Sequence, residues 1–341
     1  MPFEWISDDG IRVIAIVGIC KNAGKTTLLN HILDLMPDTA FGVLSTGIDG
    51  EESDRVFKTP KPRVRLNPGC IFCCDTAVLN AHGSDVRILE KLSFGNELRP
   101  LWLAQCRQSL ITEITGPSSG SDQIRTVQRL RHHGAKKVLI DGSLDRKAIG
   151  QSDVLDALVL VAGASFGTET EIIYELKRLL MLNDIPADTK VAENAQLYQK
   201  LSGASTLYIN TGKNWFDAGI ATLIDNEYAL DGAFKKHPKF TGIYIPGAIT
   251  EASLPKLKGF LDRAGSRILL RHPECLMLPL TGLEAFLRDY HPVVLIPYKI
   301  RLIAVNANGI GAQPHDAEAF RLKLKTSFPD SKLIDIMEME I

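Results

Sequence analysis

The chain has 341 residues, of which 45% are hydrophobic and 23% are charged, so it can bury a large core and is long enough for about two domains. Its formal net charge of -1 excludes a general attraction to nucleic acid, and no apolar run approaches the ~20 residues that span a bilayer, so we expect no nucleic acid and no membrane partner. The start MPFEWISDDG has no secretory pattern, and six cysteines in a chain of this size fit a reducing compartment, which predicts a cytoplasmic protein.

Apolar, β-branched runs alternate with amphipathic stretches along the whole length of the chain. This alternation predicts an α/β fold, in which helices cover both faces of a mostly parallel sheet. The predicted elements are strands at residues 12–17, 41–45, 110–114, 137–140, 157–161 and 207–209, and helices at residues 24–35, 121–133, 169–182 and 191–201.

A polar segment that contains glycine and proline, DGAFKKHPK at residues 231–239, predicts a domain boundary. We therefore expect a first α/β domain over residues 1–232 and a second, smaller α/β domain over residues 236–341. In the second domain the predicted strands are residues 242–245, 268–270, 293–297, 300–305 and 332–336, and the predicted helices are residues 253–263, 283–290 and 317–327.

The segment GICKNAGKTTLLNHIL at residues 18–33 joins the first strand to the first helix through a glycine-containing turn. Backbone N–H groups at such a helix start bind phosphate oxygens, a lysine reaches the β- and γ-phosphates, and a threonine hydroxyl ligates Mg²⁺. The pattern predicts a P-loop NTPase-type domain over residues 1–232. The residues predicted to bind the nucleotide are Gly18, Lys21, Asn22, Ala23, Gly24, Lys25, Thr26 and Thr27.

The glycine spacing of this loop is irregular. Five residues separate Gly18 from Gly24, where the common P-loop pattern has four, so Ile19 stands at the usual first-glycine position. The loops of dethiobiotin synthetase-like enzymes are similar in having five. The alternative is an ordinary strand-turn-helix in which Gly24 only eases close packing.

Phosphoryl transfer also needs a carboxylate near Mg²⁺. Asp49 lies in a glycine-flanked acidic loop after the second predicted strand, and Asp141 follows the apolar run KVLI as in a Walker B element. We predict Lys25, Asp49 and Asp141 as catalytic residues and Thr26, Asp49 and Asp141 as Mg²⁺ ligands. The alternative is that both aspartates are solvated turn residues, since Asp-Gly is a common turn dipeptide.

Two further segments carry weaker expectations. Ser118 and Ser119 in TGPSSG could hold an anion at a helix start or only cap that helix. Arg146 and Lys147 could neutralise phosphate charge or be solvated loop cations.

A cysteine cluster reads NPGCIFCC at residues 67–74, with His82 eight residues beyond Cys74. Cys70, Cys73 and His82 are candidate ligands of a soft metal such as Zn²⁺. No second C-x2-C pair accompanies them, and neighbouring cysteines cannot easily bind one ion. Buried thiols without a metal, or redox chemistry, are the alternatives.

AGKTTLLNHIL at residues 23–33 together with GCIFCC resembles the CobW-type metallochaperone GTPases, whose cysteine motif reads G-C-x-C-C. This chain differs by the extra phosphate-loop residue and by Phe72 within the cysteine motif. It also lacks an Asn-Lys-x-Asp motif for guanine, which favours ATP over GTP.

A longer resemblance covers nearly the whole chain. It runs through GICKNAGKTT, STGIDGEE, ITGPSSGSDQ, VLIDGSLDRKA, LVAGAS, IRLIAVNANGIGAQPHDAEAF and LIDIM. In order and spacing these are similar to the accessory reactivase subunit of cobalamin-dependent lysine 5,6-aminomutase. The resemblance implies an ATPase that reactivates such an aminomutase together with a companion ATPase subunit. A metal-delivery GTPase and an ATP-dependent kinase or ligase for a small molecule remain as alternatives.

Overall fold

The computed structural model describes residues 2–20, 22–46, 63–94, 100–143, 153–223, 227–264, 267–307, 316–329, 332–336 and 338. Its contacts divide the chain into two compact units: Met1–Ile173 with Lys299–Ile341, and Tyr174–Tyr298. The second unit is therefore an insertion in the first. In the part of the chain that is described, no helix has the length and apolar character that crossing a membrane requires.

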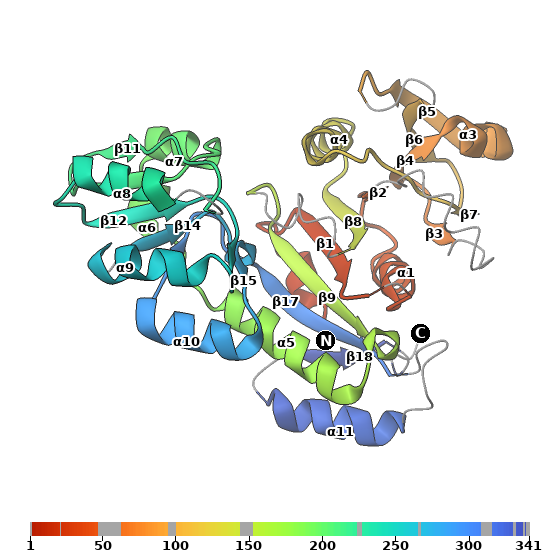
Figure 1. The fold of residues 1–341 in the computed structure, drawn as a ribbon. Coiled ribbons are helices and arrows are strands. Elements are labelled where there is room, and N and C mark those ends of the chain that lie inside the picture. The colour runs from red at the N-terminus through yellow and green to blue at the C-terminus, as the bar shows by residue number, and fades with distance from the viewer. Residues whose placement is uncertain are drawn as a thin grey trace. The chain divides into compact units, whose positions relative to one another are not determined.

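The first unit contains a nine-stranded sheet with the strand order β18-β17-β9-β1-β8-β2-β4-β6-β5 (Figure 1). Strands β18 to β4 in this order are parallel, whereas β6 is antiparallel to both β4 and β5. A separate antiparallel pair joins β3 and β7. The elements of this unit are β1 (Val13–Gly18), α1 (Lys25–Leu35), β2 (Phe41–Ser45), β3 (Val64–Leu66), β4 (Ile71–Asp75), α3 (Thr76–His82), β5 (Val86–Lys91), β6 (Leu101–Cys106), β7 (Leu110–Thr112), α4 (Gly120–His132), β8 (Lys137–Ser143), β9 (Ala157–Gly163), β17 (Ile300–Asn306), α11 (Ala317–Ser327) and β18 (Leu333–Asp335), with short 3-10 turns at Glu4–Ser7, Gly83–Asp85 and Ala164–Phe166.

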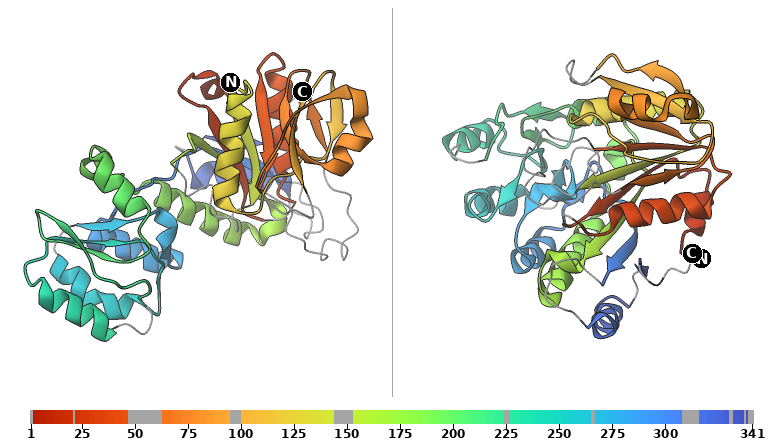
Figure 2. Two further views of the ribbon diagram at one scale, coloured as in Figure 1. Left: turned by 90° about the horizontal axis from the view of Figure 1, so that it is seen from above. Right: turned by 90° about the vertical axis from the view of Figure 1, so that its right-hand side faces the viewer.

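Helices α1 and α4 cover opposite faces of this sheet (Figures 1 and 2). Side chains alternate between the two faces along a strand. In β2, Phe41 and Val43 belong to the core beneath α1, whereas a Cβ at Gly42 would contact Leu130 of α4 and Ala135 just after it. Every residue of β1 and β9 is buried, as expected for central strands of a parallel sheet with both faces covered.

The second unit contains a five-stranded sheet with the order β11-β10-β12-β14-β16. Strands β12, β14 and β16 are parallel, and β10 is antiparallel to both of its neighbours. Helix α5 (Glu169–Asn183) begins in the first unit and ends in the second. The other elements are α6 (Thr189–Ala192), α7 (Ala195–Ser202), β10 (Tyr208–Asn210), β11 (Trp215–Asp217), α8 (Glu227–Lys236), β12 (Gly242–Ile245), β13 (Ile249–Thr250), α9 (Leu254–Ala264), β14 (Ile268–Leu270), β15 (Leu276–Met277), α10 (Leu280–Tyr290) and β16 (Val293–Val294), with a 3-10 turn at Pro273–Cys275.

The α/β class with a large, mostly parallel sheet is confirmed, but the division of the chain differs from the expected one. The expected boundary between residues 232 and 236 falls inside α8, and the expected C-terminal domain 236–341 is split, since β17 and β18 join the first sheet beside β9. The single helix expected over residues 191–201 is two helices. Asp188 caps α6. Asn194 caps α7 by accepting a hydrogen bond from Leu197 N at 3.0 Å, so a new helix begins after Asn194.

Candidate functional site

The predicted phosphate loop lies at the carboxyl edge of the large sheet. It leaves β1, whose two neighbours, β8 and β9, are both parallel to it and end at the same edge. Ile19 N extends the pairing with β9 by donating to Val161 O at 3.0 Å. The carboxyl ends of three parallel strands therefore surround the loop, which is where open α/β sheets bind ligands.

The loop leaves little room for a side chain at Gly18 and has a left-handed backbone at Gly24. A Cβ at Gly18 would lie 2.9 Å from Lys25 Nζ and 3.1 Å from Cys20 O. Gly24 has φ +101° at the position that caps α1, a left-handed conformation that favours glycine, and no side chain caps the helix there. Asn22 also has a positive φ, of 58°. Among the described residues, the N-cap position therefore supplies no side-chain acceptor to the amide groups that begin α1.

Lys25 is the first residue of α1, and its side chain folds back over the loop. Its Nζ donates to Cys20 O at 3.3 Å. The lysine is partly exposed, whereas Thr27 is exposed and Ala23 is fully buried. A cation held over uncapped backbone amides provides positive charge for a bound anion.

Asp141 lies on β8 between two strands, with Ile16 of β1 as its partner on one side and Ser45 of β2 on the other. Thr26 Oγ1 donates to Asp141 Oδ2 at 3.5 Å. The other carboxylate oxygen, Oδ1, is buried and has no hydrogen-bond partner among the described residues. Burial raises the pKa of Asp141, and the nearby Lys25 ammonium and the Thr26 hydroxyl oppose that rise.

These groups fit a magnesium ion. Hydroxyl and carboxylate oxygens are ligands that Mg²⁺ accepts, and a buried carboxylate oxygen without a partner is costly unless something binds it. Thr26 and Asp141 would hold the ion directly or through its water molecules, and Lys25 would contact the phosphates. The bound ion would neutralise the negative charge of those phosphates.

Two residues that sequence reasoning did not single out lie against the loop. A Cβ at Gly163, the last residue of β9, would lie 2.7 Å from Ala23 Cα, so only glycine allows the loop to pack so closely. Asn306 ends β17, and its Nδ2 lies 3.3 Å from the position of a Cβ on Gly24. In the sequence, Gly163 and Asn306 each stand at the end of an apolar run, and this position could have marked them as residues at the edge of the sheet.

The loop at residues 115–120 lies against the end of β2. A Cβ at Gly116 would lie 2.0 Å from Ser45 O, and the buried Gln123 Nε2 donates to Thr46 O at 3.1 Å and to Pro117 O at 3.0 Å. Ser119 caps α4 by accepting from Asp122 N at 3.2 Å. Capping therefore explains Ser119 without an anion.

Several predicted site residues lie outside the described residues: Lys21, Asp49, Arg146 and Lys147. Their roles remain predictions. The structure thus brings together Gly18, Gly24, Lys25, Thr26 and Asp141 from the predicted set.

The predicted soft-metal site at Cys70, Cys73 and His82 is not formed. Among the described residues, no group of three or more His, Cys, Asp or Glu side chains could hold a metal ion. Cys73 and Cys74 are neighbours on β4, so their side chains point to opposite faces of the sheet. All three cysteines of the motif are buried, and burial raises the pKa of the Cys70 and Cys73 thiols, which disfavours the thiolates that a metal needs.

Searches against protein-family models and curated protein sequences found no match to this chain.

Proposed function

We propose that the first unit has a P-loop NTPase-type fold and binds Mg-ATP at the carboxyl edge of its sheet. The observation that carries this proposal is Asp141 Oδ1, which is buried beside Thr26 without a hydrogen-bond partner among the described residues, near the start of α1. A purely structural turn would gain nothing from a carboxylate that is buried without a partner, whereas a metal-phosphate site uses it. ATP is favoured over GTP because the chain lacks an Asn-Lys-x-Asp motif.

Each group of the site has a distinct task in this proposal. The amides at the start of α1 bind phosphate oxygens, and Lys25 exchanges its contact with Cys20 O for one with a phosphate. Thr26 and Asp141 orient the ion. Asp49, outside the described residues, stays a candidate for positioning the attacking water, as the catalytic assignment of Lys25, Asp49 and Asp141 requires.

Calorimetric titration of the protein with ATP and Mg²⁺ tests the proposal. Replacing Lys25 by alanine removes a charge-assisted phosphate contact of roughly 1.5 to 3 kcal/mol, so Lys25→Ala should weaken ATP binding about tenfold or more. Lys177→Ala is the matched control, because Lys177 is an exposed lysine on α5. Equal ATP affinity in wild type and Lys25→Ala would refute the site.

We further infer that ATP turnover serves reactivation of a cobalamin-dependent aminomutase in the cytoplasm, with a companion ATPase subunit. The support is the series of motifs, from GICKNAGKTT to LIDIM, that are similar to the reactivase subunit in order and spacing. The metal-delivery alternative is not carried forward, because its cysteine ligands are buried and do not converge.

A reactivation assay tests this partner separately from the nucleotide site. Inactivated aminomutase should regain activity only with this protein, the companion subunit, ATP, Mg²⁺ and fresh adenosylcobalamin. For the nucleotide to act on the aminomutase, the aminomutase must bind the ATP-bound and ATP-free states of this protein with different affinities. Such differences are typically ~5- to 150-fold. If ATP binds at Lys25 but the aminomutase neither binds this protein nor recovers, the partner is wrong and the nucleotide site stands.

A further inference from the structure

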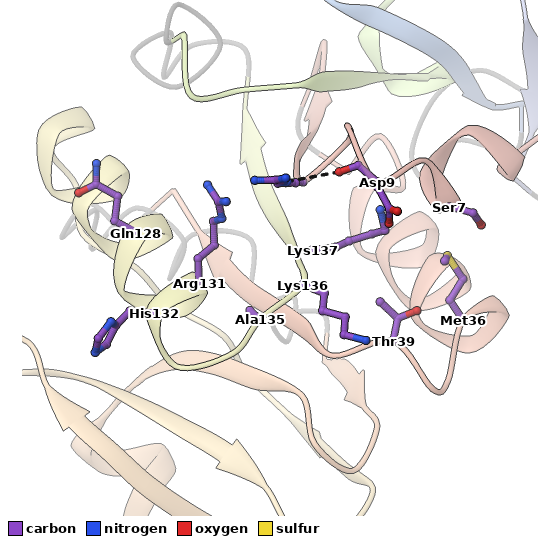
Figure 3. Close-up of a pocket in the computed structure, with 11 residues that line it drawn as sticks. Ser7, Asp9, Met36, Thr39, Gln128, Arg131, His132, Ala135, Lys136 and Lys137 are labelled. Atoms are coloured by element: carbon purple, nitrogen blue, oxygen red, sulfur yellow. Dashed lines mark hydrogen bonds between the residues drawn. The ribbon is translucent and has the colours of Figure 1, made fainter.

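A second hollow, of about 800 Å³, opens at the amino edge of the large sheet, opposite the phosphate loop (Figure 3). Arg12 immediately precedes β1, Thr39 precedes β2, and Lys136 precedes β8, while Arg131 lies in the last turn of α4. Strand β1 is six residues long and rises about 3.3 Å per residue, so this hollow lies roughly 20 Å from the phosphate loop.

Positive charge dominates the lining of this hollow. Arg12, Arg131 and Lys136 are exposed, and none of them forms an ion pair with any residue in the described ranges. The lining has one carboxylate, that of Asp9. Arg12 Nε donates a hydrogen bond to the backbone oxygen of Asp9 at 3.3 Å. In Figure 3 the Lys136 side chain extends toward Thr39, whose hydroxyl could donate to the same ligand.

A fourth cation lies beneath the hollow in a fixed position. Lys137 is only 7% exposed, and its Nζ donates to Asp8 O at 2.9 Å and Ile11 O at 2.8 Å. Through these two hydrogen bonds the Lys137 ammonium holds the backbone at Asp8 and Ile11 beside the hollow. The two other carboxylates nearby are occupied by backbone amides: Asp8 accepts from Gly10 N at 2.8 Å, and Asp156 accepts from Arg12 N and Val13 N, both at 2.9 Å.

We propose that this hollow is a binding site for a small molecule that carries two or more phosphate groups. Exposed cations that line one concave surface without an ion-pair partner among the described residues favour the binding of an anion. Guanidinium and ammonium groups both donate charge-assisted hydrogen bonds to phosphate oxygens. The volume is in the range of small-molecule sites, and a chain with a net charge of -1 has no general attraction for nucleic acid.

Calorimetry with sodium pyrophosphate at low ionic strength tests this site. The Lys25→Ala variant serves as the background, because it weakens binding at the proposed phosphate loop and leaves the hollow unchanged. Pyrophosphate should still bind to Lys25→Ala. Adding Arg131→Gln and Lys136→Gln should weaken that binding about tenfold or more, because two charge-assisted contacts are lost. The matched control adds Arg87→Gln and Lys177→Gln, two exposed cations elsewhere, and should bind like the background.

Thermal unfolding of each variant checks that it is folded, which is expected because the substituted side chains are exposed. The proposal is overturned if Lys25→Ala abolishes all pyrophosphate binding, or if the Arg131→Gln, Lys136→Gln variant binds as well as the control. Citrate, which carries similar charge on carboxylates, should bind more weakly than pyrophosphate, and equal binding would contradict the assignment to phosphate. These results do not depend on whether ATP binds at Lys25.

Discussion

Asp141 combines two properties that a structural aspartate rarely has. Its Oδ1 is buried without a partner in the described part of the chain, and its Oδ2 accepts a hydrogen bond from Thr26 at the long distance of 3.5 Å. Burial raises the pKa of Asp141, so the fold favours the protonated acid over the carboxylate. At neutral pH the ionised side chain therefore lowers the stability of the ligand-free protein. The proposed role in binding Mg²⁺ explains why the chain carries it.

Asp141→Asn should separate stability from function. The variant should unfold at the same temperature as wild type or higher at pH 7, because a charge that the fold disfavours has been removed. The difference should narrow as the pH falls through the raised pKa, where wild-type Asp141 becomes neutral as well. The same variant should lose the enhancement of ATP binding by Mg²⁺, measured by calorimetry with and without the ion.

Asp156→Asn is the matched control for this prediction. Asp156 Oδ2 accepts from Arg12 N and Val13 N, so its charge is used by the fold and the substitution should lower the unfolding temperature. If Asp141→Asn were as unstable as Asp156→Asn and kept the Mg²⁺ effect, Asp141 would be a structural residue.

At the scale of elements, the site is made where β1, β8 and β9 end together and α1 begins. Much of this could be predicted, because each central strand is a continuous apolar run and α1 shows a helical spacing of buried residues. The position of the turn between β1 and α1, which we propose as the phosphate loop, was predictable for the same reason. Its glycine and lysine stand between a strand and a helix that the pattern identifies independently.

Other elements could not be predicted from local pattern. Strand β4 contains Cys73 and Cys74, and Cys70 directly precedes it. As small buried side chains these cysteines pack like hydrophobic residues, so the apolar character of the strand was hidden by a motif typical of metal sites. The contact of Gly163 with Ala23 was equally hidden, since it joins residues far apart in the sequence. The spacing of apolar residues, every second residue in a strand or every 3.6 residues in a helix, indicates which face of the element is buried. It does not indicate which other segment of the chain covers that face.

At the scale of the whole molecule, the chain forms its first unit from two distant segments. Alternating strands and helices predict an α/β class, but they do not specify which strand pairs with which. β17 reads like any other apolar strand, and only its pairing with β9 places it in the large sheet. This pairing brings Asn306 to Gly24 of the phosphate loop, so the site depends on both ends of the chain.

The measurement that tests the central proposal most directly is a crystal structure of the protein with Mg²⁺ and a non-hydrolysable ATP analogue. We expect the triphosphate on the amides at the start of α1, with Lys25 Nζ moved from Cys20 O to a phosphate oxygen. The ion should lie beside Thr26 Oγ1, on the side of Asp141. An analogue bound elsewhere, with Lys25 still on Cys20 O and no ion near Asp141, would contradict the account.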